Sequence, residues 1–316
     1  MKTKILGSTG LAVSELCVGT LPMGPLQSNI PVDTGADILL KAMERGVNFF
    51  DTAQMYRSYP YLKKAIKQYG KDVVIASKST AADYKGMEEA ITEALRELGR
   101  DYIDIFHLHA ARADETLFEK RSGAIEALLK AKKSGLIRAI GVSTHHPGLT
   151  AKAAGAAEID VIFPLINKAG LGIFNNDLPR MLEAVEIVHK SGKGMYAMKV
   201  LAGGYLVRDM GDAIAYARAI PGMHAISIGV TTMEELDLQV RIFNDEKIDP
   251  AELAILKSKK QIKIMPFLCV ACGTCVKTCP NGALSMVDKL PVPDPGKCVL
   301  CGYCTPVCPA FAIRLK

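Results

Sequence analysis

The chain of 316 residues has no apolar run that reaches the ~18 residues needed to cross a membrane. Its N-terminal segment has one basic patch and no long apolar stretch behind it, so a secretory signal is not expected. A glycine-rich G-x-G-x-x-G turn is also absent. The absence of a membrane span and of a secretory signal predicts a cytoplasmic protein and gives no reason to expect a membrane partner.

Cysteine is scarce over most of the chain. Before Cys269 the sequence contains a single cysteine, Cys17, and the other eight cysteines lie between Cys269 and Cys308. A disulfide scaffold would require an oxidising compartment, which the N-terminus argues against. Cys17 lies inside an apolar run and is expected to be an inert buried thiol.

The eight late cysteines form an internal repeat. Each half reads C-x2-C-x2-C-x3-C-P, which resembles the two-cluster bacterial ferredoxins over residues 262–316. Three closely spaced thiolates wrap one cubane, and the fourth ligates the other cluster. The spacing therefore predicts two [4Fe–4S] clusters, the first held by Cys269, Cys272, Cys275 and Cys308 and the second by Cys279, Cys298, Cys301 and Cys304. Zinc ribbons are the alternative, but zinc uses two well-separated cysteine pairs.

Charge is concentrated in the same segment. The stretch from Lys259 to Lys316 has eight basic and two acidic residues, which accounts for the whole net charge of +6. A basic tail can indicate nucleic-acid binding. Cations that offset cluster thiolates explain it better, so no nucleic-acid partner is expected.

The first part of the chain alternates short apolar runs with amphipathic stretches. Val, Ile, Phe and Ala fill these runs without clean alternation, as in strands buried on both faces. The expected strands are Leu16–Thr20, Asn48–Thr52, Val73–Ser77, Ile103–His109, Ile137–Ser143, Val161–Asn167, Gly194–Val200 and Ala225–Val230. Eight such units favour an α/β fold of the (β/α)8 TIM barrel type over a doubly wound sheet, which would usually show a glycine-rich turn. We expect this barrel over residues 1–245, a linker over 246–261 and a small α+β ferredoxin-like domain over 262–316.

Catalytic groups of such barrels come from the carboxyl ends of several strands. The polar residues found there, or in the loops that follow, are Asp51, Tyr56, Lys78, His109, Ser143, Asn167 and Lys199. Together, Asp51, Tyr56, Lys78 and His109 make a plausible proton-transfer site, in which an ammonium lowers the pKa of a phenol and a carboxylate holds the ammonium. Individually, Asp51 could instead cap a helix and Lys78 could be a solvated charge.

Several segments resemble the aldo-keto reductase family: LGSTGL from Leu6, FDTAQMY ending at Tyr56, ASK ending at Lys78, YIDIFHLH ending at His109 and IGVS ending at Ser143. The resemblance implies that Tyr56 is the general acid, that Lys78 and Asp51 tune it, and that His109 orients a carbonyl. It also implies a nicotinamide cofactor, NAD(H) or NADP(H), bound without a Rossmann fold. The residues it places there are Ser143, Asn167, Met198, Lys199, Gly229 and Glu235. The whole chain is similar to the subgroup with a C-terminal iron–sulfur domain.

The sequence also departs from that family. Arg57 replaces the Gly that commonly follows the catalytic Tyr, Phe163 replaces a Gln that contacts the nicotinamide amide, and Met198 replaces a stacking aromatic. The basic pair for the 2′-phosphate of NADP falls near Gly229 and Glu235. The tetrad is intact, but the cofactor site is altered.

The last strand–helix segment favours NAD(H) over NADP(H). It carries Glu234 and Glu235 but no basic residue, and a carboxylate near the ribose accepts from free hydroxyls and repels a phosphate. The two glutamates are also typical of a first helical turn, and Arg241 lies further along the helix, within conceivable reach of a phosphate.

Three histidines have less defined roles. His107 lies on the same strand face as His109 and is expected to be a core histidine rather than a site residue. His145 and His146 begin a loop over the barrel mouth, where a metal site would need a third ligand that the sequence does not identify.

The sequence leaves three functions open. The first is an iron–sulfur oxidoreductase that reduces a small-molecule carbonyl. The second is an electron-transfer protein that couples a barrel-bound redox cofactor to the clusters and to a protein partner. The third is a redox sensor that binds cofactor without turnover. Hydride carries two electrons and a [4Fe–4S] cluster carries one, and no flavin motif is present to convert between them.

Overall fold

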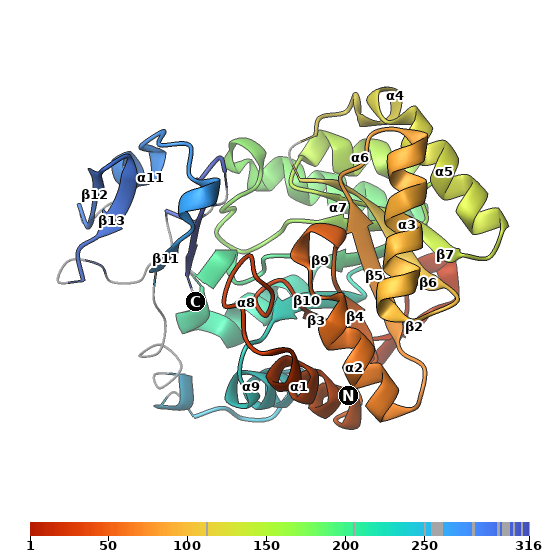
Figure 1. Ribbon diagram of the computed structural model, residues 1–316, viewed down its shortest axis with the longest axis horizontal. Helices are drawn as coiled ribbons and strands as arrows, with labels where there is room; N and C mark the ends of the chain where they lie inside the picture. Colours follow the sequence, from red (N-terminus) through yellow and green to blue (C-terminus); the bar gives the residue numbers. More distant parts are fainter. Residues whose placement is uncertain are drawn as a thin grey trace.

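The computed structural model describes residues 1–111, 113–204, 206–249, 251–253, 262–279, 282–295, 298, 304–305, 307–310 and 312–315. Part of the expected linker and the predicted cluster ligand Cys301 lie outside these residues. Figure 1 shows a barrel surrounded by helices and a smaller lobe beside it that contains the last part of the chain.

Eight parallel strands close into the predicted barrel, in the order β10-β3-β4-β5-β6-β7-β8-β9. The strands are β3 Leu16–Gly19, β4 Phe49–Asp51, β5 Val74–Ser79, β6 Ile103–Ala110, β7 Ile137–Thr144, β8 Val161–Pro164, β9 Gly194–Ala197 and β10 Ala225–Gly229. Each overlaps one of the expected strands, so the (β/α)8 prediction is confirmed. The largest difference in length is at β8 and β9, which both end three residues before the sequence prediction.

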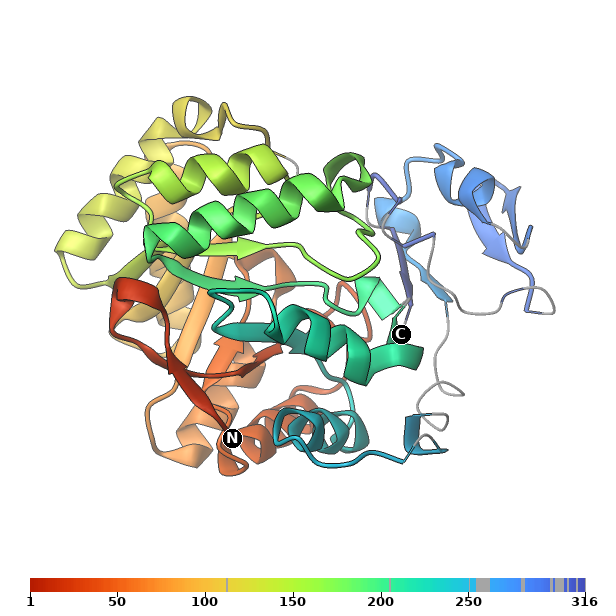
Figure 2. The same cartoon turned by 180° about the vertical axis from the view of Figure 1, so that it is seen from behind.

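Helices cover the outside of the barrel (Figures 1 and 2). They are α1 Val32–Glu44, α2 Tyr59–Tyr69, α3 Tyr84–Leu98, α4 Leu117–Lys120, α5 Ser122–Lys133, α6 Pro147–Gly155, α7 Leu178–Ser191, α8 Met210–Arg218 and α9 Met233–Phe243. Helix α3 shows the local reasons for these boundaries. The Asp83 carboxylate accepts from the Gly86 amide at 2.8 Å, and Gly99 ends the helix in the left-handed conformation at φ 67°.

The barrel interior is filled by side chains rather than open. Phe49, Ile105, Phe163 and Tyr196 are among the buried residues that pack together there. An antiparallel hairpin of β1 Thr3–Ile5 and β2 Ala12–Ser14 adds Leu6 and other apolar groups to the same cluster. A larger apolar cluster joins the outer faces of the strands to the helices. This packing fixes the strand ends that carry the polar residues.

The described residues of the cluster domain form two small antiparallel sheets. Strand β11 Ile262–Ile264 pairs with β14 Ile313–Leu315, and β12 Leu284–Val287 pairs with β13 Leu290–Pro293. A short helix, α11 Thr274–Thr278, and the 3₁₀ turn η6 Pro266–Leu268 lie between β11 and β12. Buried apolar residues and cysteines form its core: Cys275, Leu284, Cys304, Cys308, Ala312 and Ile313.

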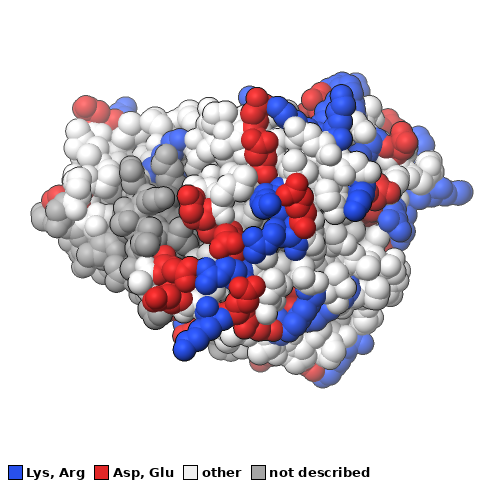
Figure 3. Space-filling view, turned by 90° about the horizontal axis from the view of Figure 1, so that it is seen from below, with Lys and Arg blue, Asp and Glu red and all other residues white. Residues whose placement is uncertain are grey.

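Charged side chains of both signs are intermixed on the face seen in Figure 3. Ion pairs also join segments far apart in the chain, including Arg45 with Asp237 at 3.0 Å and Arg218 with Asp245 at 2.7 Å. Within the described part of the chain, no helix has the length and apolar character of a membrane span.

Candidate active site and iron–sulfur centre

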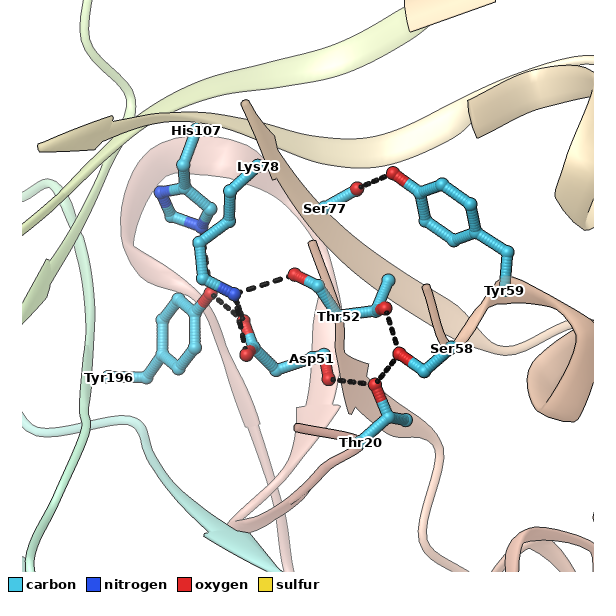
Figure 4. A network of polar contacts seen from close by, with 9 residues as sticks. All are labelled: Thr20, Asp51, Thr52, Ser58, Tyr59, Ser77, Lys78, His107 and Tyr196. Carbon is cyan, nitrogen blue, oxygen red and sulfur yellow. Dashed lines mark hydrogen bonds and ion pairs between the residues drawn. The ribbon is translucent and has the colours of Figure 1, made fainter. Parts of the chain in front are cut away.

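A buried ion pair lies at the carboxyl ends of β4 and β5. The Lys78 Nζ lies 2.8 and 2.7 Å from the two carboxylate oxygens of Asp51 and donates to the Thr52 carbonyl at 2.6 Å (Figure 4). Burial by itself would lower the pKa of Lys78, but Asp51 and Tyr56 together outweigh this effect and the pKa is raised. Both groups are shielded from water, so neither acts as the solvated charge or helix cap considered from the sequence.

Tyr56 ends the 3₁₀ turn η2, Gln54–Tyr56, which follows β4. Its ring centroid lies 4.9 Å from the Lys78 Nζ, and its side chain is almost fully buried. Burial raises the pKa of the Tyr56 phenol, and the nearby Lys78 ammonium lowers it less than burial raises it. The phenol is therefore protonated at neutral pH and can donate a proton, whereas the sequence analysis expected Lys78 to favour the phenolate.

His109 faces Tyr56 from the end of β6. The two rings meet edge to face with their centroids 5.9 Å apart. Burial, followed by the positive charges of Lys78, Lys199 and Arg121, lowers the pKa of His109 to about 3. The imidazole is thus neutral at physiological pH and carries one N–H that can donate to a substrate oxygen. Among the described residues, its Nδ1 has no hydrogen-bond partner.

The sequence analysis missed a second layer beneath this site. The Tyr196 hydroxyl donates to an Asp51 carboxylate oxygen at 3.2 Å and lies 2.7 Å from His107 Nε2. Gly141 makes room for the His107 ring, because a Cβ at this position would lie 2.1 Å from Nδ1. His107 is buried, as expected, but Tyr196 also connects it to the ion pair (Figure 4). Alternation along β9 could have placed Tyr196 inside the barrel, but not its partners.

A set of buried hydroxyls positions the segment that carries Tyr56. The Ser58 hydroxyl lies 2.7 Å from the Thr20 hydroxyl and 2.9 Å from the Thr52 hydroxyl. The Tyr59 hydroxyl forms a hydrogen bond with the Ser77 hydroxyl at 2.8 Å. These contacts tie the chain just after Tyr56 to three neighbouring strand ends (Figure 4).

The departure at Arg57 has a structural consequence. Arg57 adopts the left-handed conformation, at φ 53°. This conformation strains most side chains and suits glycine, the residue expected there in the family. The backbone at Tyr56 also passes close to Gly24, where a Cβ would lie 2.4 Å from the Tyr56 carbonyl oxygen. Arg57 therefore occupies a backbone position that would suit glycine better.

The predicted cofactor residues have different surroundings. Ser143 is buried opposite His109 in the register of β6 and β7, and its hydroxyl has no hydrogen-bond partner among the described residues. The Asn167 side chain instead donates to the carbonyls of Leu171 and Lys199 at 2.9 and 3.3 Å, and it accepts from the Leu171 amide at 3.1 Å. These contacts hold the loops after β8 and β9.

The residues near β10 are also engaged locally. The Glu235 carboxylate accepts from the amide and hydroxyl of Thr231, both at 2.9 Å, at the start of α9. Gly229 packs against Pro22, where a Cβ would lie 2.3 Å from the proline Cγ. Arg241 forms ion pairs with Asp237, Glu246 and Glu252. The described contacts of Glu235 and Arg241 are local, and the preference for NAD(H) over NADP(H) stays a prediction.

The remaining candidates are buried or pack locally. Phe163 stacks on Tyr196 with ring centroids 3.9 Å apart, and the backbone of Met198 pairs with that of Leu165 in an isolated parallel β-bridge. Cys17 is fully buried in β3, and burial raises the pKa of its thiol well above the usual range. His146 caps α6 by accepting from the Leu149 amide at 3.3 Å.

Four cysteines from both halves of the repeat line one cavity in the cluster domain. They are Cys269, Cys272, Cys275 and Cys308, the set predicted for the first cluster. In the described part of the chain, no three His, Cys, Asp or Glu side chains converge closely enough to hold a single metal ion. Four thiols arranged around a cavity fit a polynuclear cluster, in which each thiolate binds a different iron.

Backbone and side-chain donors point at the cysteine sulfurs. The amide of Ala312 donates to Cys308 Sγ and the amide of Ala283 to Cys279 Sγ, both at 3.2 Å. These contacts are equivalent in the two halves of the repeat, because each amide lies four residues after its cysteine. Hydrogen bonds of this kind stabilise thiolates and tune cluster potentials. Of the second predicted set, Cys279, Cys298 and Cys304 are described, and Cys301 is not.

The fold and these two centres define a class of protein: a parallel (β/α)8 barrel with a buried Lys–Asp pair beneath a tyrosine and a histidine, joined to a cysteine-rich cluster domain. Comparison with known families identifies it further. Residues 15–256 match the Aldo/keto reductase family, and residues 268–312 match the 4Fe-4S dicluster domain. The chain belongs to the aldo/keto reductase family and carries a C-terminal 4Fe-4S dicluster domain.

Individual relatives are distant. The chain is 24% identical to the uncharacterized oxidoreductase YqkF of Bacillus subtilis (strain 168), over 82% of this chain and 96% of that protein. It is 29% identical to methylglyoxal reductase DkgA of Escherichia coli (strain K12), over 54% of this chain and 62% of that protein. Among solved structures, a putative aldo-keto reductase from Pseudomonas aeruginosa matches with a TM-score of 0.65 and 25% identity, covering 77% of this chain and 94% of that one.

Proposed function

We propose that this oxidoreductase reduces a small-molecule carbonyl with NAD(P)H and that Tyr56 donates the proton. The observation that carries the proposal is the meeting of Tyr56 and His109 above the buried Lys78–Asp51 pair. A protonated phenol and a neutral imidazole side by side can both donate to one carbonyl oxygen as negative charge develops on it.

Each residue has a distinct role in this proposal. When bound, the nicotinamide would supply the hydride, and Ser143 is the residue best placed to hold its amide. Tyr56 transfers its proton to the oxygen that becomes an alcohol. Lys78 stabilises the phenolate that remains, and Asp51 keeps the ammonium in place. His109 orients the carbonyl because its pKa keeps it neutral.

The Tyr56→Phe variant tests the proposal. We expect carbonyl reduction to fall by ~10²–10⁴-fold, the range of a lost general acid, while nicotinamide binding is retained. Tyr59→Phe is the matched control, since it removes another buried hydroxyl that bonds Ser77 rather than the ion pair. Assays should be anaerobic and use both NADH and NADPH. Undiminished turnover by Tyr56→Phe would show that the proton comes from another group.

Electron transfer between the two centres is a second candidate function. It is favoured by the contact between the cluster domain and the barrel, where Lys263 donates to the Gln27 carbonyl. Anaerobic mixing with NADH or NADPH, without any carbonyl substrate, tests it through the cluster absorbance. Bleaching favours electron transfer, whereas an unchanged spectrum favours carbonyl reduction with clusters that serve a structural role.

A further inference from the structure

The last strand of the cluster domain lies against the mouth of the barrel. In Figures 1 and 2, the sheet of β11 and β14 lies between the barrel and the rest of the cluster domain. Lys263 of β11 donates to the carbonyl of Gln27, in the loop after β3. Strand β14 packs against η4, Ala202–Gly204, in the loop after β9. The Thr305 methyl is so close to Gly203 that an added Cβ would lie 3.0 Å from it.

This docking brings Arg314 to the catalytic residues. Arg314 is the cross-strand partner of Lys263, so their side chains leave the same face of the sheet. Its guanidinium is largely shielded from water, and burial lowers the pKa of Arg314 to about 10. Cys308 and, less strongly, Tyr56 are the ionisable groups whose charges raise its pKa, and its guanidinium also donates to the Ile313 carbonyl at 3.0 Å. A domain that the sequence would assign to electron transfer therefore contributes a cation to the barrel site.

The barrel mouth is already rich in positive charge. The charges that act most strongly on His109 are those of Lys78, Lys199 and Arg121. Arg121 also donates to the His109 carbonyl at 3.1 Å. The carboxylate that acts on Tyr56 is Asp51, and Lys78 neutralises it. A site with excess positive charge and little water attracts an anion more strongly than a neutral molecule.

We propose that Arg314 binds an anionic oxygen group of the substrate, a carboxylate or a phosphate, so that the enzyme selects carbonyl compounds that carry such a group. The inference rests on the proposed carbonyl reduction. A guanidinium presents a rigid fork of donors that matches both groups. Removing a buried charged partner that recognises a substrate generally weakens binding by ~10²-fold or more.

Matched substrate pairs test this inference with the anaerobic holoenzyme. Pyruvate is compared with hydroxyacetone, and glyceraldehyde 3-phosphate with glyceraldehyde, for the wild type, Arg314→Met, Arg314→Lys and Lys263→Met. We expect the wild type to prefer the anionic member of at least one pair. Arg314→Met should lose ~10²-fold in kcat/KM for that member, mainly through KM, and about threefold or less for its neutral partner. For the anionic member, the kcat/KM of Arg314→Lys should lie between those of the wild type and Arg314→Met. Lys263→Met should retain the preference. The pair that responds identifies carboxylate or phosphate.

Other results would overturn the inference. A wild type that reduces neutral and anionic members equally would contradict it while leaving carbonyl reduction intact. Equal losses for both members in Arg314→Met, with weaker NAD(P)H binding or lost iron, would assign Arg314 to the cofactor or to the first cluster. If the wild type reduces no carbonyl, the proposed function fails. Calorimetry with oxamate and inorganic phosphate then tests anion binding at Arg314 by itself. Binding by the wild type that Arg314→Lys weakens supports the site, and absence of binding refutes it.

Discussion

The hydroxyl of Tyr196 is the most direct test of the buried network beneath the site. The Tyr196→Phe variant keeps the ring and its stacking on Phe163 but removes two contacts, at 3.2 Å to Asp51 and 2.7 Å to His107. Asp51 retains both contacts with Lys78. His107 would lose its partner at Nε2, and its Nδ1 already has none among the described residues.

The expected loss can be estimated from these contacts. A hydrogen bond to a charged group contributes about 1.5–3 kcal/mol, and a buried polar atom left without a partner costs about 1–3 kcal/mol. Since the two effects overlap, we expect a loss of about 2–3 kcal/mol. For a barrel of this size, that corresponds to a decrease in Tm of about 4–10 °C.

Thermal unfolding followed by circular dichroism under anaerobic conditions measures this change at a fixed scan rate. Tyr59→Phe is the control, since it loses one bond to a neutral hydroxyl and should cost about 1 kcal/mol. If Tyr196→Phe unfolds within a degree of the wild type, or no lower than the control, the hydroxyl does not stabilise the ion pair as the geometry indicates.

Two further predictions concern protonation and metal content. His107 and His109 are neutral in the fold with lowered pKa values, about 3 for His109, so below pH 6.5 the unfolded chain binds protons that the folded chain does not. Stability should therefore fall with decreasing pH, by about 2 kcal/mol at pH 5 through His109 and further through His107, and denaturant titrations at pH 7 and pH 5 that give equal stability would contradict this. Cys308→Ala should reduce the iron content from about eight to about four per chain, whereas Cys17→Ser should leave it unchanged; loss of all iron, or stoichiometric zinc, would refute the ligand assignment.

The barrel could be predicted because its strands are buried on both faces and each is followed by an amphipathic helix. The hairpin of β1 and β2 could not, since the three residues of β1 are all exposed and show no pattern. The position of the cluster domain relative to the barrel also could not be predicted from the sequence. Contacts such as that of Lys263 with Gln27 join segments far apart in the chain and depend on the assembled fold.

The structure brings some of the predicted site residues together and gives others local contacts, for different physical reasons. Strand ends converge in any parallel barrel, so Asp51, Lys78 and His109 could be brought together from the sequence, and the structure does so. The polar groups near the expected cofactor site form hydrogen bonds with neighbouring residues of the fold. Thr232 accepts from the Glu235 amide at 3.2 Å, and the pattern T-x-x-E already indicates a helix cap. A local hydrogen bond of this kind competes directly with a role in ligand binding.

Because the cluster domain docks on the barrel, the contributions of the two centres to activity cannot be distinguished by removing the domain. Deleting residues 262–316 would remove the clusters, but it would also remove Arg314 and uncover the loops around Tyr56. A loss of activity in such a truncated chain would therefore not show that electrons pass through the clusters. Point variants separate the effects, because Arg314→Met changes one charge at the barrel mouth and Cys308→Ala changes one cluster. If the clusters only support the domain, both variants should impair the same anionic substrates. If the clusters carry electrons, Cys308→Ala alone should abolish cluster reduction by the nicotinamide.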